Sequence, residues 1–171
     1  MNWGYDDGAN DDQDAGADDI LMYVGDDFEF VTPHWDALVE QDVKDTQGWC
    51  LITGPDGYLS NETCPTFFFV HRKVVEAVGH FVWPEARKEG TDLAWGQTMQ
   101  PMGLLLWDDR LRMEHWHSTR DGAKPDETFT RLASQPVPQY GKAYYEYIKG
   151  SQDRIAEAIK KEETCLKSCP S

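Results

Sequence analysis

Residues 66–79, TFFFVHRKVVEAVG, constrain the fold most strongly because a strand pattern passes directly into a helix pattern. The first six residues are rich in aromatic and β-branched side chains, which is typical of a buried strand. The helical part begins at Arg72 and ends at Gly79, a residue type that commonly terminates helices. A strand followed at once by a helix is a unit from which α/β domains are built.

The same alternation runs along most of the chain. Further strands are predicted at residues 20–24, 49–54, 104–107 and 111–116, with a turn at residues 108–110 between the last two. One helix is predicted to open at Thr32, with this residue as N-cap and Pro33 in the first turn. Another is predicted to begin near Thr91 and to end at residues 101–103. The sequence therefore predicts an α/β fold with helices flanking a sheet.

A long amphipathic helix is predicted from about residue 139 onwards. Its apolar residues recur at helical spacing and are interpreted as core or interface rather than as a ligand site: Tyr144, Tyr147, Ile148, Ile155 and Ile159. Residues 1–19 are rich in Gly, Asn and Asp, so they read as an acidic tail, which Trp3 and Tyr5 would dock onto the domain. We divide the chain into this acidic segment (1–19), an α/β domain (20–135) and a C-terminal helix with its tail (136–171).

The formal net charge of −15 excludes a basic surface for nucleic-acid phosphates, so no direct nucleic-acid binding is expected. No run of 18 apolar residues and no secretory leader pattern is present, which predicts a soluble, cytoplasmic chain without a membrane span. The four cysteines lack the spacing of paired zinc knuckles, and free thiols are expected.

Three groups of polar residues are candidates for chemistry. Asp26 and Asp27 directly follow the first strand, and paired carboxylates there suit a divalent cation such as Mn²⁺ or Mg²⁺. His115 and His117 share one face of a predicted strand and suit a transition metal. Asp92 stands at a helix start, where it suits a general base. Each group also has an ordinary structural explanation: a solvated acidic turn, packed or surface histidines, and a helix cap.

The order of these segments resembles the later part of a GT-A glycosyltransferase of the family 2 kind. In sequence order, the segments that carry the resemblance are ILMYVGDD, TPHWDAL, FFFVHRKVVEAVGHF, TDLAWGQTMQPMG and LRMEHWH. The resemblance covers roughly residues 18–131. It implies a partial GT-A-like, Rossmann-like mixed sheet and metal-dependent transfer of a sugar from a nucleotide-sugar to an acceptor glycan or other hydroxyl.

The resemblance also implies roles for individual residues. Asp27 would bind the metal that bridges the nucleotide diphosphate, with Asp26 beside it and Gly25 in the place of the family's first acidic residue. Asp92 would be the base that deprotonates the acceptor hydroxyl. His115 or His117 would complete the metal site.

Family members carry a longer segment before the acidic motif, which builds the nucleotide-binding half. We therefore also expect a homo-oligomer or docking onto a larger assembly, since a shortened sheet leaves an unpaired edge. The alternative function is a non-catalytic scaffold, decoration or interaction module derived from a glycosyltransferase. A plain metal or carbohydrate binder is a third possibility, because tryptophan faces stack on sugars.

Overall fold

The computed structural model describes residues 19–84, 90–117, 130 and 141–168. A four-stranded mixed sheet lies at its centre, in the order β1 (Ile20–Tyr23), β4 (Phe68–His71), β3 (Leu51–Thr53) and β5 (Leu105–Trp107). β4 runs antiparallel to β1 and β3, whereas β5 runs parallel to β3. The predicted α/β class is confirmed.

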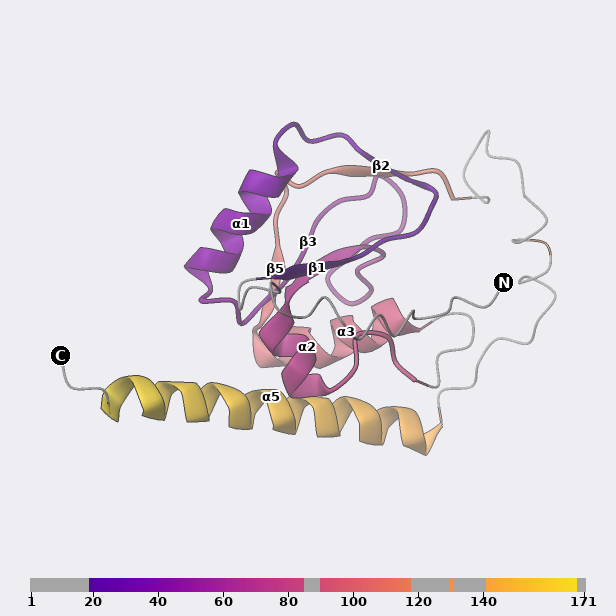
Figure 1. The fold of residues 1–171 in the computed structure, drawn as a ribbon. Helices are drawn as coiled ribbons and strands as arrows, with labels where there is room; N and C mark the ends of the chain where they lie inside the picture. The colour runs from indigo at the N-terminus through magenta and orange to yellow at the C-terminus, as the bar shows by residue number, and fades with distance from the viewer. Residues whose placement is uncertain (1–18, 85–89, 118–129, 131–140, 169–171) are drawn as a thin grey trace, which may run out of the picture.

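Helices cover both faces of this sheet because β3 and β4 bury side chains in both directions. Ile52 and Phe69 pack on the face covered by α1 (Trp35–Asp45). Leu51 and Phe68 pack on the opposite face, against α2 (Arg72–Val78) and α3 (Thr91–Met99). Figure 1 shows α1 on one side of the sheet and the other helices on the opposite side.

The long helix α5 (Lys142–Ser168) lies along α2 and α3 on the outer side of the molecule (Figure 1). Tyr144, Ile148 and Ile155 are buried, and the other two predicted apolar positions are partly buried against the same core. The core role predicted for this stripe is confirmed. Near the end of the helix, Glu162 accepts a hydrogen bond from Trp49 Nε1 at 2.7 Å.

The helix ends follow the predicted residue chemistry with one exception. Gly79 caps α2 with φ 86°, and the short 3-10 helix η1 (Gln100–Met102) follows α3 and ends at Gly103. Thr32 is not the N-cap of α1, so that prediction is wrong. Its Oγ1 instead donates to Arg110 O at 2.7 Å and accepts from Arg112 N at 2.8 Å, and α1 begins after His34.

A second, two-stranded sheet joins β2 (Phe28–Phe30) to β6 (Met113–His115) in antiparallel pairing. The sequence did not predict β2, and it did not indicate that the two strands flanking residues 108–110 lie in different sheets. The chain is redirected where it crosses Gly54: a Cβ there would lie 2.2 Å from Leu111 O. Only a glycine permits so close a crossing.

A buried acidic cluster, Asp42 and Asp108, lies beside this turn and is paired with Arg110. Arg110 Nη2 lies 3.1 Å from Asp42 Oδ1 on α1 and 2.9 Å from Asp108 Oδ2. Burial opposes ionisation of both carboxyls, but the hydrogen bonds from Arg110 hold the pKa of Asp108 below its usual range. Burial, together with the charge of Asp108, raises the pKa of Asp42.

Most of the predicted acidic segment lies outside the described residues, because residues 1–18 are not among them. The predicted domain boundary at residue 135 also lies outside them, within residues 131–140. Asp19 is described, and its carboxylate accepts from Arg72 Nη2 at 2.6 Å. Within the described ranges, no helix is both long enough and apolar enough to cross a membrane.

Candidate functional site

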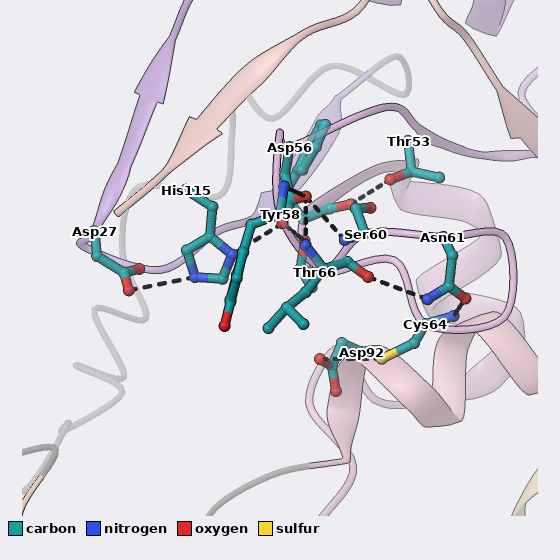
Figure 2. Close-up of polar contacts among 12 residues, drawn as sticks. Asp27, Thr53, Asp56, Tyr58, Ser60, Asn61, Cys64, Thr66, Asp92 and His115 are labelled. Carbon is teal, nitrogen blue, oxygen red and sulfur yellow. Dashed lines mark hydrogen bonds and ion pairs between the residues drawn. The ribbon is translucent and has the colours of Figure 1, made fainter. Parts of the chain in front are cut away.

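The pairing of β2 with β6 brings the first acidic turn to the late histidines. Phe28 is opposite His115 in the register, and Trp116 N donates to Asp27 O at 2.8 Å. The Phe28 ring stacks on the His115 ring with centroids 4.0 Å apart. As a result, Asp27 Oδ2 lies 3.3 Å from His115 Nε2. Figure 2 shows the two side chains pointing toward each other.

The other edge of β6 lies against the turn that follows β3. Met113 N donates to Pro55 O and His115 N donates to Asp56 O, each at 3.0 Å. This backbone pairing places the Asp56 carboxylate beside the imidazole, with Oδ2 2.9 Å from His115 Nδ1. The imidazole is therefore held between two carboxylates, Asp56 on one side and Asp27 on the other (Figure 2).

Asp56 organises the turn as well as the histidine. It is 1% exposed, and its Oδ1 accepts from the backbone N–H groups of Tyr58, Leu59 and Ser60 at 2.8–2.9 Å. Its Oδ2 accepts from Thr66 Oγ1 at 2.8 Å. Burial opposes its ionisation, but these hydrogen bonds and the one from His115 prevail and hold the pKa of Asp56 well below the usual range. The group is therefore a carboxylate at neutral pH.

Asp92 faces the same region from the first turn of α3. Its Oδ1 accepts from Leu93 N at 2.8 Å, and its Oδ2 lies 3.7 Å from Cys64 Sγ. Burial and the charge of Asp92 raise the pKa of the Cys64 thiol to about 12, so this cysteine stays protonated and is no thiolate nucleophile. Burial likewise raises the pKa of Tyr23 to about 12, which leaves a neutral phenol beside the carboxylate.

The position of Asp92 depends on a close backbone contact. A Cβ at Gly96 would lie 2.5 Å from Thr63 O, so α3 packs directly on the loop that carries Cys64. Hydrogen bonds within that loop fix its path, because Asn61 Oδ1 accepts from Thr63 N at 3.0 Å and from Cys64 N at 3.1 Å. The helix and the loop together hold the Asp92 carboxylate in place.

A cavity of about 720 Å³ opens between these segments. Four of the predicted site residues, Asp27, Asp92, His115 and His117, are among its lining residues. The other lining residues are Tyr23, Gly25, Phe28, Leu59, Asn61, Cys64, Thr66, Gly90 and Leu93.

Asp26 is exposed and does not line the cavity. Gly25 affects the orientation of the Asp27 side chain, since a Cβ at position 25 would lie 2.6 Å from Asp27 Oδ1. The absence of a side chain at Gly25 thus leaves room for the observed orientation of the Asp27 carboxylate.

The donor set suits a divalent cation in part. Asp27 Oδ2 and His115 Nε2 face each other, and the second nitrogen of His115 is bound to a carboxylate, as it commonly is in metal-ligating histidines. The ring of His117 lies 5.2 Å from that of His115, centroid to centroid. Among the described residues, no three His, Cys, Asp or Glu side chains are grouped closely enough to hold a metal ion. Asp27 and His115 are therefore the two residues here that could act as ligands, and a cation held by them would take its other ligands from water or substrate oxygens.

Sequence reasoning missed Asp56, because residues 54–57 read only as a turn. One signal was present: this carboxylate follows the carboxyl end of a buried strand, as Asp27 does, and such positions commonly face ligands. What the sequence could not provide is the pairing of residues 55–56 with β6, which is made over a long separation along the chain.

Comparisons with models of known protein families, with curated proteins and with solved structures found no match.

The free thiols expected of Cys50, Cys64 and Cys165 are confirmed, whereas Cys169 lies outside the described residues.

Proposed function

We propose that the protein is a metal-dependent glycosyltransferase that moves a sugar from a nucleotide-sugar to an acceptor hydroxyl. The observation that supports this most strongly is the shared cavity. Asp27, Asp92, His115 and His117 come from three separate segments of the chain and line one space. These are the residues to which the resemblance to family 2 GT-A enzymes assigns the metal and the base.

Asp92 is the group that would accept the acceptor's proton. A general base, most often an imidazole or a carboxylate, must lie within hydrogen-bond reach of the reacting hydroxyl. Asp92 fits because it lines the cavity and its partners Leu93 N and Cys64 Sγ are donors, which leave the carboxylate able to accept. The neutral Tyr23 and Cys64 do not compete with it for a proton.

Asp27 and His115 are the residues that would hold the cation, Mn²⁺ or Mg²⁺, with His117 beside them. A cation bound there would neutralise the charge of a leaving diphosphate. Asp27 contributes a negatively charged oxygen, and the remaining coordination positions match a site that shares its metal with substrate phosphates.

The first test is binding. Calorimetry with Mn²⁺ and a panel of nucleoside diphosphates should show metal-dependent nucleotide binding that Asp27→Asn weakens by tenfold or more, on the order expected for loss of a metal ligand or its partner. Asp36→Asn is the matched control, because Asp36 is an exposed aspartate on α1 outside the cavity lining. No heat with any nucleotide would contradict the proposal.

The second test is transfer. With a panel of nucleotide-sugars, Asp92→Asn should lower the rate about 10²–10⁴-fold, the range for loss of a general base, while nucleotide binding persists. Equal rates for Asp92→Asn and wild type would remove Asp92 from the mechanism.

The alternative, a non-catalytic interaction module, is favoured by one observation. Among the described strands, β1 and β5 are the two edges of the four-stranded sheet, and edges of this kind accept strands from other chains. This alternative predicts that Asp27→Asn and Asp92→Asn change nothing except local charge, and that oligomeric state responds to substitutions along β1.

A further inference from the structure

We propose that Asp56 is a positioning residue that keeps the imidazole hydrogen of His115 on Nδ1, so that Nε2 faces the cavity as a ligand atom for a transition-metal cation such as Mn²⁺ in preference to Mg²⁺. The inference extends the proposed function, on which its metal part rests. It assigns a role to a residue that the family resemblance did not indicate.

The hydrogen-bond inventory of Asp56 determines the tautomer. An ionised carboxylate has acceptors only, and each of its oxygens is already engaged by donors. Oδ1 receives three backbone N–H groups, and Oδ2 receives Thr66 Oγ1 together with His115 Nδ1. The contact at 2.9 Å therefore requires a hydrogen on Nδ1. In the neutral imidazole, Nε2 is then the atom with the lone pair.

In this tautomer the nitrogen with the lone pair, Nε2, lies beside the Asp27 carboxylate. Nε2 lies 3.3 Å from Asp27 Oδ2, and both residues line the cavity. Imidazole nitrogen is a poor ligand for Mg²⁺, which prefers oxygen, whereas first-row transition metals bind it well. A site that offers one imidazole nitrogen beside one carboxylate should therefore bind Mn²⁺ more tightly than Mg²⁺.

The structure allows this idea to be tested by one isosteric substitution, Asp56→Asn. Three backbone N–H donors converge on the Oδ1 position, so the amide oxygen of an asparagine must occupy that position. The amide NH₂ then takes the place of Oδ2 and donates to His115 Nδ1, which reverses the tautomer. The hydrogen of His115 then lies on Nε2, the atom that faces Asp27. Nε2 can bind a metal only after losing that hydrogen.

The first measurement is the tautomer itself, read from the ¹⁵N chemical shifts of the two His115 ring nitrogens in alkaline buffer. Wild type should carry its hydrogen on Nδ1, and Asp56→Asn should carry it on Nε2. Thr66→Val is the matched control, because it removes a different hydrogen bond to the same Oδ2 and should leave the Nδ1 tautomer unchanged. Unaltered thermal melting and amide spectra would show that each variant is folded.

The second measurement is metal affinity, taken from Mn²⁺ electron paramagnetic resonance titrations and Mg²⁺ competition, with and without a nucleoside diphosphate. Asp56→Asn should weaken Mn²⁺ binding about 10–100-fold, the range seen when the partner of a ligating histidine is lost, and should change Mg²⁺ binding far less. His115→Gln should have a similar effect, and the double variant should be no weaker than either single variant.

The inference is overturned if the His115 hydrogen of the wild-type protein is found on Nε2. It is also overturned if Asp56→Asn binds Mn²⁺ with an affinity within about twofold of wild type. Failure of the proposed function has a different signature. If the tautomer reverses and Mn²⁺ affinity falls but no nucleotide-sugar is turned over, the inference holds and glycosyl transfer does not. If sugars are transferred while Asp56→Asn binds Mn²⁺ normally, the function holds and the inference falls.

Discussion

The two sheets of this protein are built on different physical principles. In the four-stranded sheet, β3 and β4 are fully buried, and apolar side chains on both faces pack against helices. The strand pair β2 and β6 is only three residues long on each side, and β2 is largely exposed. Met113 and Phe28 pack on the apolar cluster that contains Ile52, but the rest of its surroundings are linked by polar side chains, with Asp56 at their centre.

This difference suggests how stability and chemistry are divided along the chain. Burial of apolar surface is the main stabilising term in a domain, whereas buried polar groups cost free energy unless they are satisfied. The large sheet should therefore determine whether the protein folds. The small sheet and its neighbouring turn should determine where Asp27 and His115 lie.

The largest expected effect is on the large sheet. Phe68→Ala removes a side chain with no exposed surface that packs with Tyr23, Phe81 and Trp95, and we expect a loss of about 3–5 kcal/mol in the free energy of unfolding. Phe30→Ala in β2 is the matched control. Phe30 is 37% exposed, so chemical denaturation should show a clearly smaller loss. Equal losses would mean that the small sheet contributes to the core as much as the large one does.

The next effect concerns the contact between α3 and the loop at Thr63. Gly96→Ala places a methyl group against Thr63 O and Pro65, and overpacking of this kind costs about 1–3 kcal/mol. Gly150→Ala in α5 is the control, because its Cβ would meet only the end of Arg154 at 3.3 Å, and helix propensity should make this change neutral or stabilising by up to about 1 kcal/mol. Thermal denaturation compares the two. If the two variants melt alike, the close contact at Gly96 does not constrain the helix.

A third effect tests the acidic cluster beside the turn by its pH dependence. The lowered pKa of Asp108 gives stability that is present above the ordinary aspartate pKa of about 3.9 and is lost as the pH falls through the folded value. The raised pKa of Asp42 gives stability that is present below that value and is lost as the pH rises.

Asp108→Asn should therefore be less stable than wild type at neutral pH. This difference in the free energy of unfolding should become smaller below about pH 4. The free energy of unfolding of Asp42→Asn should rise relative to that of wild type as the pH rises from about 4 to 7. Urea denaturation across this range measures the difference from wild type for both variants. The same sign of pH dependence in the two variants would contradict the assigned charge states.

The smallest effect separates the adjacent acids. Asp26 is exposed and outside the cavity lining, so Asp26→Asn should change the free energy of unfolding by no more than about 0.5 kcal/mol. It should also leave Mn²⁺ affinity close to wild type, whereas Asp27→Asn weakens it. Equal weakening by both substitutions, measured by calorimetry, would place Asp26 in the site after all.

The sequence predicted the large sheet well because its determinants are local. The apolar run before Arg72, the glycine after α2 and the stripe along α5 each express hydrophobic periodicity or capping within a few residues. β2 escaped prediction because its alternation of Phe, Glu and Phe is too short to be recognised as a strand pattern.

The site was predictable only in part, for a related reason. Four of its residues could be named from the order of short motifs, and Asp27, Asp92, His115 and His117 do line one cavity. Asp56 was missed because an Asp-Gly pair in a turn is ordinary turn chemistry, which outweighed its place after a buried strand. Its partnership with His115 exists only once residues 55–56 pair with β6.

The contact between Gly96 and Thr63 O has a consequence for how this cavity could change over evolutionary time. The anchor of Asp92 is a contact of helix backbone with loop backbone, which replacement of most side chains leaves intact. The side chain of Leu59 also lines the cavity. Ligand preference could therefore diversify by single substitutions at such lining positions, while the carboxylate on α3 keeps its place.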